Sequence, residues 1–265
     1  MLRNLKYLSG ATLLIFILFG CQQQYSTDPV EENSKLLKPG GSAISFDGID
    51  DYVNIPHDVS LNATDELTIS AWVYFDGEYP IEYSSIVTKG DNAGTSTVNN
   101  NYTLHSSGDG RFYLTATTSG GGGFQIESSN TPLSLDSWHH IAVTFSFDGT
   151  DGEAKFYIDG SFINSVTGSL DGGLLPNDAP LTIGVDFPLN AEFWEGKIDE
   201  VKIWNEVLSG SQVISAMGAA TPRARSLMGY WRFNGGSGLT ARDRSRNHNH
   251  GSLEGGAMWT FPGAI

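Results

Sequence analysis

Four strings with strand-like alternation, each attached to a turn, constrain the fold of this chain more than any other feature. Apolar residues recur at every second position, which predicts strands with a buried face because successive side chains of a strand point to opposite sides. Asp-Gly steps between the strands suit the positive φ angles of tight hairpins. The strings are AISFDGIDDYVNI from Ala43, SWHHIAVTF from Ser137, AKFYIDG from Ala154 and GKIDEVKIWNEVLS from Gly196. They predict an all-β, antiparallel chain.

The rest of the chain after residue 40 follows the same pattern. In residues 67–75 (LTISAWVYF) every second side chain from Leu67 to Phe75 is apolar. One short helix is predicted from Ser209, whose hydroxyl can cap a first turn, to about Met217. Further strands are predicted at residues 111–117, 138–147, 154–158, 181–185 and 197–204. Strands of this kind predict a two-sheet antiparallel sandwich.

In their order and spacing, the four strings resemble the laminin G-like jelly roll, the concanavalin A-like sandwich that pentraxins and legume lectins share. The resemblance covers about residues 41–217 and implies a jelly-roll core there. Two later strings, LMGYWRFNGGSG from Leu227 and DRSRNHNHGSLEGGAMW from Asp243, are similar to the lead-in that often flanks such domains. We expect residues 218–265 to add strands to the same sandwich. The alternative is a truncated repeat, which would expose its apolar side chains.

The first 20 residues have the pattern of a secretory signal peptide. Arg3 and Lys6 precede an apolar run, and Gly20 precedes Cys21, the single cysteine of the chain. The run is shorter than the roughly 20 apolar residues that a membrane-spanning helix needs. This segment resembles the lipobox of bacterial lipoproteins, which implies that Cys21 carries the lipid and anchors the protein to the bilayer. The alternative is an uncleaved anchor with an ordinary cysteine.

Residues 21–40 are polar and lack periodicity, which predicts a flexible tether between the lipid and the folded domain. Gln22, which follows the cysteine, is compatible with outer-membrane sorting by analogy with other lipoproteins. We therefore expect a lipid-anchored protein of the bacterial cell envelope, in the outer membrane.

The charge of the chain limits its partners. Loss of Arg3 and Lys6 with the leader leaves 13 basic and 30 acidic residues, a formal charge of −17. Nucleic acid and anionic lipid headgroups both require a cationic face, so neither is an expected partner. A divalent cation suits such a chain.

The strand 195–201 carries the carboxylates that a glycosidase of this fold would use. Strand alternation predicts that Asp199 and Glu200 point to opposite faces, which excludes an acid and nucleophile pair. The Glu-x-Asp-x-x-Glu pattern of the family's hydrolases is also absent. His139 and His140 open a strand, where a structural role is expected. The sequence therefore favours a protein without catalytic activity.

Two groups of oxygen ligands are candidates for calcium, which takes carboxylate, amide and carbonyl oxygens from loops. The resemblance to pentraxins implies one site with Asp91, Asn92 and Asp186. The second candidate brings Asp47, and with it Asp50, near Asp199 on the closing strand. The alternative for both is that these side chains cap turns through bonds to the backbone.

Aromatic residues in or beside turns are candidates for stacking on a sugar. They are Tyr79, Tyr83, Phe187, Phe193 and Trp194. The alternative is that they cover the ends of the sandwich. The hypothesis from sequence is a non-catalytic, envelope-anchored module that binds carbohydrate or another extracellular polymer, assisted by calcium. Its rivals are a structural or protein-adhesion domain without a sugar site and, third, a divergent glycan hydrolase or lyase.

Overall fold

The computed structural model describes residues 41–80, 83–91, 99–127, 131–186, 192–218 and 224–265. Contacts between Cα atoms separate two units, Met1–Leu37 and Lys38–Ile265, and every described residue belongs to the second. The signal segment, the tether and Cys21 lie outside the described residues. Within the described residues, no helix has the length and apolar character needed to cross a bilayer.

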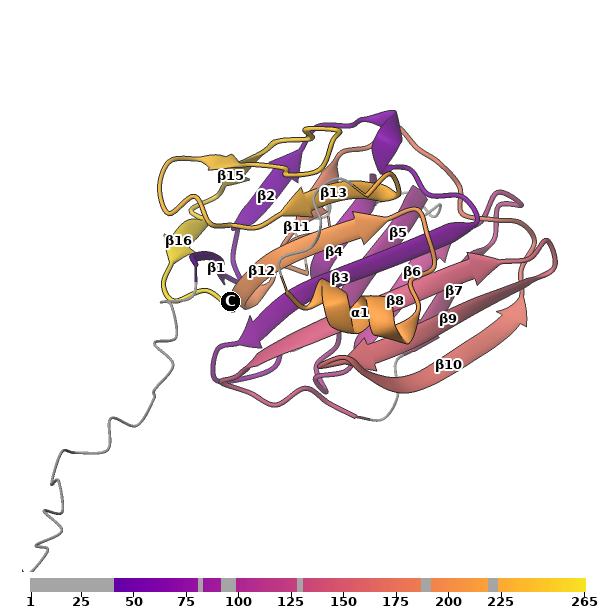
Figure 1. Cartoon of the computed structure of the whole chain (residues 1–265), viewed down its shortest axis with the longest axis horizontal. Helices are drawn as coiled ribbons and strands as arrows, with labels where there is room; N and C mark the ends of the chain where they lie inside the picture. The colour runs from indigo at the N-terminus through magenta and orange to yellow at the C-terminus, as the bar shows by residue number, and fades with distance from the viewer. Residues whose placement is uncertain (1–40, 81–82, 92–98, 128–130, 187–191, 219–223) are drawn as a thin grey trace, which may run out of the picture. The chain divides into compact units, whose positions relative to one another are not determined.

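The described chain forms two antiparallel sheets of eight strands each, so the predicted all-β sandwich is confirmed. Sheet A has the order β10-β9-β8-β3-β12-β1-β16, and β13 also pairs with β12 (Figure 1). Its strands are β1 (Ala43–Asp47), β3 (Glu66–Phe75), β8 (Trp138–Phe147), β9 (Asp151–Ile158), β10 (Ser161–Ser169), β12 (Glu195–Trp204), β13 (Leu227–Trp231) and β16 (Met258–Thr260).

Sheet B has the order β14-β15-β2-β11-β4-β5-β6-β7. Its strands are β2 (Tyr52–Ile55), β4 (Ser84–Asp91), β5 (Asn99–Ser106), β6 (Phe112–Thr117), β7 (Gly123–Glu127), β11 (Leu181–Ile183), β14 (Thr240–Ala241) and β15 (Gly251–Glu254). A short 3-10 helix, η1 (Val59–Leu61), follows β2.

The main core lies between the two sheets and is built by strand alternation. In β3, every second side chain from Leu67 to Phe75 is buried in the core, as the sequence predicts. The opposing side chains of sheet B include Tyr102 and Leu104 on β5. Burial of this apolar area contributes roughly 25 cal/mol per Å² and holds the two sheets together.

A second, smaller apolar cluster lies on the outer face of sheet A. There the helix α1 (Gly210–Ala216) lies over the strands of sheet A (Figure 1). Its Val213 is buried in one cluster with Tyr157 and Trp204. The helix begins with a capping box, in which Ser209 and Gln212 bond each other's backbone N–H groups. The helix predicted from Ser209 is therefore present.

The C-terminal residues pair with strands of both sheets. β13 bonds β12, β16 bonds β1, and β15 bonds β2. Tyr230 and Trp231 are fully buried. Gly255, with φ of 75°, packs against the backbone of Asp50, where a Cβ atom would overlap the Asp50 carbonyl oxygen.

Candidate functional site

The outer face of sheet B carries an aromatic patch of three residues, Tyr83, His105 and Tyr113. Because Tyr102 and Leu104 of β5 point into the core, alternation turns His105 to the opposite face. His105 lies opposite Tyr113 of β6 in the strand register. The ring centroids of Tyr83 and His105 are 4.9 Å apart, and those of Tyr83 and Tyr113 are 5.9 Å apart.

Polar groups border the aromatic patch. Gln125 of β7 donates to the Tyr83 hydroxyl at 3.5 Å, and the Arg111 guanidinium lies 5.7 Å from the Tyr113 ring centroid. Tyr83 is 40% exposed. Burial lowers the pKa of His105 to about 4, so its imidazole is neutral at pH 7, and no described residue bonds its Nε2. The patch thus offers one open ring, with the Gln125 amide and the Arg111 guanidinium, which pairs with Asp109, beside it.

The other aromatic residues predicted for the site lie elsewhere. Trp194 is 0% exposed and packs on Phe75 at 4.7 Å between ring centroids, so its assignment as a ligand-binding residue is wrong. The reason is that the backbone N–H of Trp194 donates to the Gly184 carbonyl at 2.9 Å. This bond holds the chain against the sandwich just before β12. Tyr79 is half-buried edge-on to Phe75, and its hydroxyl donates to the Leu133 carbonyl.

Two aromatic predictions remain. Phe193 is half-buried beside Trp194, and Phe187 lies outside the described residues. Of the predicted aromatic residues that the structure describes, only Tyr83 is exposed to solvent.

The calcium group predicted from Asp91, Asn92 and Asp186 does not converge. Gly184 N–H bonds the carbonyl of Ile86, which places Asp186 beside the first half of β4, whereas Asp91 is its last residue. Five strand positions, roughly 16 Å, separate Ile86 from Asp91. Calcium ligands lie about 2.3–2.6 Å from the ion, and the backbone positions of the two residues are too far apart in the sheet for one shared site. Asn92 lies outside the described residues.

The second predicted calcium group is also separated. Asp47 lies opposite Glu195 in the register of β1 and β12, and Asp199 is four residues, roughly 13 Å, further along β12. Asp199 is fully buried, and its carboxylate accepts hydrogen bonds from the backbone N–H groups of Glu200 and Ala264. Asp199 is therefore not part of a site with Asp47.

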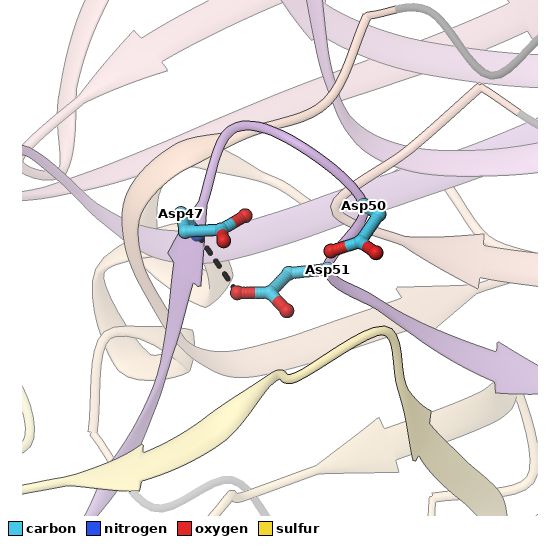
Figure 2. Close-up of side chains that lie close together, drawn as sticks. All are labelled: Asp47, Asp50 and Asp51. Atoms are coloured by element: carbon cyan, nitrogen blue, oxygen red, sulfur yellow. Dashed lines mark hydrogen bonds between the residues drawn. The ribbon is translucent and has the colours of Figure 1, made fainter.

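Asp47 instead gathers with Asp50 and Asp51 in the turn between β1 and β2 (Figure 2). One carboxylate oxygen of each lies within 4.8 Å of the others. Asp51 is buried, and its Oδ2 accepts the Asp47 N–H at 2.8 Å. Burial raises the pKa of Asp51, and its Oδ1 has no hydrogen-bond partner among the described residues. These oxygens are the ligand type that calcium prefers.

The two carboxylates of β12 do not lie on opposite faces, so that prediction from alternation is wrong. A register shift between Asp199 and Lys202 marks a β-bulge, and Glu200 has φ of 51°. Ile198 and Val201 both enter the core, which leaves Asp199 and Glu200 on the outer side.

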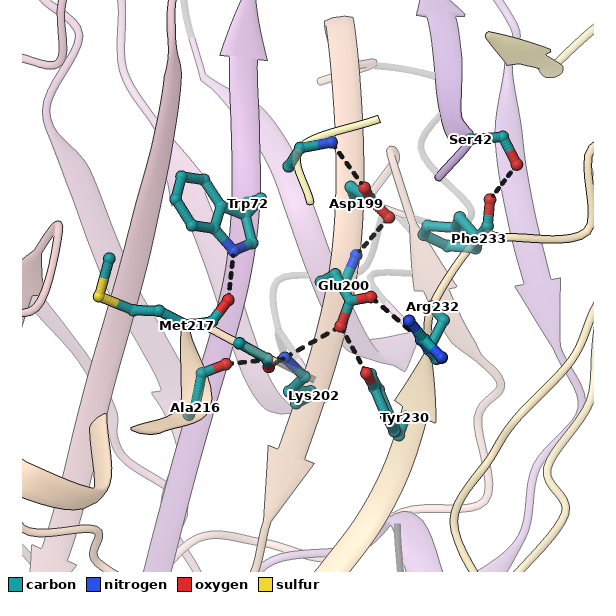
Figure 3. Close-up of polar contacts among 12 residues, drawn as sticks. Ser42, Trp72, Asp199, Glu200, Lys202, Ala216, Met217, Tyr230, Arg232 and Phe233 are labelled. Atoms are coloured by element: carbon teal, nitrogen blue, oxygen red, sulfur yellow. Dashed lines mark hydrogen bonds and ion pairs between the residues drawn. The ribbon is translucent and has the colours of Figure 1, made fainter. Parts of the chain in front are cut away.

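Glu200 is the centre of a buried charged network on this outer side (Figure 3). Its carboxylate pairs with Lys202 Nζ at 3.0 Å and Arg232 Nε at 3.2 Å, and it accepts the Tyr230 hydroxyl at 2.5 Å. Lys202 also donates to the carbonyls of Ala216 and Gly218 at the end of α1. Burial raises the pKa of Asp199 to about 8. Both carboxylates are fully buried, so a polysaccharide cannot reach them.

A second polar group joins the start of β8 to the turn after β9. Ser134 Oγ lies 2.6 Å from His139 Nε2, and His139 Nδ1 lies 2.8 Å from Asp159 Oδ2. This is the contact order of a Ser-His-Asp triad. Asp159 also accepts the His140 N–H at 2.9 Å, and its side chain is 45% exposed. A catalytic triad needs oxyanion donors in a site that excludes water. This group is exposed, so it is best explained as a structural contact between two turns.

Several of these residues were missed in the sequence for identifiable reasons. Asp51 follows Asp50 directly, and the paired acids in the first string were a usable signal. His105 and Tyr113 come together only through the β5–β6 register. The Asp109-Gly110 turn, in which Gly110 has φ of 75°, closes this hairpin and was a further usable signal.

Comparison with known proteins assigns the family. The model of the concanavalin A-like lectin/glucanases superfamily, in its laminin G form, matches residues 47–214, more than half of the chain. The chain belongs to this superfamily. The superfamily match covers all strands from β2 to β12 and ends within α1.

The known proteins that this chain resembles differ greatly in length. A rat protein with sushi, von Willebrand factor type A, EGF and pentraxin domains is 35% identical over 94 residues, 33% of this chain and 3% of its own length. A Bacteroides ovatus protein assigned a carbohydrate-binding role has a TM-score of 0.63 at 18% identity, over 85% of this chain and 61% of its own. A heptameric SAP-like pentraxin of Limulus polyphemus has a TM-score of 0.52 at 17% identity, over 83% and 95%. At these identities the two structures show a shared fold.

Proposed function

We propose that this protein is a non-catalytic carbohydrate-binding module and that the aromatic patch of sheet B is its sugar site. The observation that carries the proposal is the exposed Tyr83 ring, held against His105 and Tyr113 with Gln125 and Arg111 at its border. A flat ring stacks on the apolar face of a sugar, and adjacent donors bind its hydroxyl groups. The role assigned to the Bacteroides ovatus protein of the same fold agrees with this proposal.

The proposal includes the place of the module in the cell. Residues 1–20 are proposed as a leader, Cys21 as the lipid-bearing residue, and residues 21–40 as a tether that holds the domain off the outer membrane. Lipid is thus a partner through Cys21. Nucleic acid is not a proposed partner, because the formal charge of the chain is −15.

Calcium is proposed at the turn of Asp47, Asp50 and Asp51. The support is the approach of three carboxylates within 4.8 Å, with the buried Oδ1 of Asp51 left unpaired among the described residues. An ion there would offset the mutual repulsion of the acids and tie the β1–β2 turn, which makes its role structural.

The test of the sugar site is binding of the full chain to an array of neutral oligosaccharides, followed by titration of any sugar that binds. Tyr83→Ala is expected to weaken binding at least tenfold, because it removes the stacking ring. Phe162→Ala, which removes an exposed ring from β10 of sheet A, is the matched control and is expected to leave affinity unchanged. Equal losses in the two variants, or no neutral sugar bound, would favour the protein-adhesion alternative.

A further inference from the structure

Arginines are concentrated in one part of this acidic chain. The chain has a formal charge of −15, and six of its eight arginines lie within residues 223–246. Three of these, Arg232, Arg242 and Arg244, line one open pocket near the C-terminal strands, with a water-accessible volume of about 20 Å³. The described lining of this arginine pocket includes no carboxylate.

Strand alternation places two of the arginines on one face. From the end of β14 onward, Ala241, Asp243 and Ser245 are buried, whereas Arg242 and Arg244 are exposed. The acid in this segment is turned inward. Asp243 accepts hydrogen bonds from the backbone N–H groups of Tyr230, Ser245 and Asn249. Its charge is therefore held away from the two guanidinium groups.

Arg232 reaches the same pocket from the end of β13. Its Nε donates to Glu200 at 3.2 Å, and Glu200 is fixed by Lys202 and the Tyr230 hydroxyl (Figure 3). This contact uses Nε and leaves the terminal Nη groups without a partner among the described residues. Within the described chain, Arg242 and Arg244 also form no hydrogen bond or ion pair through their side chains. The forked guanidinium group matches the oxygens of a carboxylate or sulfate.

The pocket also has an aromatic wall. The Trp259 indole lines it, and its N–H bonds the Gly238 carbonyl at 2.6 Å. The ring lies against Gly235, where a Cβ atom would come within 2.8 Å of it. Trp259 is therefore held in place as a flat surface beside the arginines.

The size and the surrounding charge select the kind of ligand. Pockets for drug-sized ligands have roughly 300–1,000 Å³, so this one, of about 20 Å³, can take only a small anionic group, with the rest of the ligand outside it. An extended polyanion such as nucleic acid, or an anionic bilayer, would meet the negative field of the rest of the chain. An isolated anionic group on a saccharide would meet the three arginines alone.

We propose that the arginine pocket binds the carboxylate or sulfate group of an acidic saccharide, with Arg232, Arg242 and Arg244 around the anionic group and Trp259 against the sugar ring. This site is separate from the aromatic patch. The patch lies on β5 and β6 of sheet B, whereas the pocket lies beside β13, β14 and β16.

The test is calorimetric titration of the full chain with four probes: methyl galacturonide, galactose 6-sulfate, methyl galactoside and sodium sulfate. One of the two acidic saccharides is expected to bind more tightly than sodium sulfate, with an affinity that falls as salt rises. Which of the two acidic saccharides binds shows whether the pocket takes a carboxylate or a sulfate group. Methyl galactoside is expected to leave the arginine pocket empty.

Variants at exposed positions test the pocket without affecting folding. Arg242→Gln and Arg244→Gln are each expected to weaken acidic saccharide binding at least tenfold. Arg246→Gln is the matched control, because Arg246 is exposed in the same segment and does not line the pocket. Tyr83→Ala is expected to keep acidic saccharide binding, which separates this proposal from that of the aromatic patch.

Three outcomes would overturn the proposal. Neither acidic saccharide binds at millimolar concentration, or sodium sulfate binds as tightly as both. The third outcome is that Arg246→Gln weakens acidic saccharide binding as much as Arg242→Gln does. Binding would then be due to general charge attraction and not to the pocket.

Discussion

Glu200 and Arg232 pair at 3.2 Å across β12 and β13, although Glu200 is fully buried and the Arg232 side chain is 40% exposed. The β-bulge makes this possible, because it turns Glu200 out of the core and toward the strand that Arg232 follows. The pair therefore connects the centre of sheet A to the arginine pocket at its edge.

Removal of Glu200 is expected to destabilise the fold strongly. Glu200→Ala leaves the buried Lys202 without its counter-charge, and such a loss costs about 3–5 kcal/mol. Urea denaturation measures the change in the free energy of unfolding. Glu195→Ala, at the exposed start of the same strand, is expected to change it by less than about 0.5 kcal/mol. A cost below about 1 kcal/mol for Glu200→Ala would mean that the network contributes little.

Acid is expected to destabilise the protein through its buried histidines. Burial, together with the charge of Lys202, lowers the pKa of His140 to about 3, and burial lowers that of His105 to about 4. Below pH 6.5 the unfolded chain takes up protons that the native imidazoles do not. Stability therefore falls from about pH 6.5 down to the native pKa values, by up to about 1.4 kcal/mol per pH unit and histidine.

Replacement of His140 tests this expectation. Its two ring nitrogens have no hydrogen-bond partner among the described residues, and its ring packs on Trp72. His140→Phe is expected to reduce the loss of stability between pH 7 and pH 4.5, measured by urea denaturation at each pH. His248→Phe, at an exposed position, is the control. Asp199, with its pKa raised to about 8, works in the opposite direction, because its stabilising contribution is lost as pH rises from about 4 to 8.

Calcium is expected to raise the melting temperature of the chain. A ligand that binds only the folded state stabilises it by about 2.7 kcal/mol at a concentration of 100 Kd. Thermal unfolding is compared in calcium and in chelator. Asp51→Asn is expected to abolish the difference, whereas Glu66→Gln, at the exposed start of β3, is expected to retain it. The absence of any shift at millimolar calcium would remove the metal from the proposal.

The Ser134, His139 and Asp159 group is expected to stabilise a turn and to lack hydrolytic activity. His139→Ala removes its two hydrogen bonds at a cost of about 1–2 kcal/mol, which urea denaturation will show. The wild-type chain is expected to leave nitrophenyl acetate unhydrolysed above the buffer rate. Turnover that disappears in Ser134→Ala would revive the hydrolase alternative.

Much of the fold was predictable because its signals are local. Strand alternation identified the buried face of β3, and the capping pattern at Ser209 identified α1. Alternation failed at Asp199 and Glu200, because a bulge depends on how β12 pairs with β3 and has no period of its own. The candidate site was predicted poorly. Of the aromatic residues predicted for it, Tyr83 is exposed, whereas Trp194 lies in the core.

The sequence by itself determined the sandwich, its strands and its acidic character, since these follow from the identity and spacing of neighbouring residues. Only the tertiary structure decided which side chains meet. It brought Tyr83 to His105 and turned Glu200 toward Arg232. The physical reason is that binding groups assemble across strands, and strand register depends on packing of the whole core. The lipid anchor at Cys21 stays a prediction.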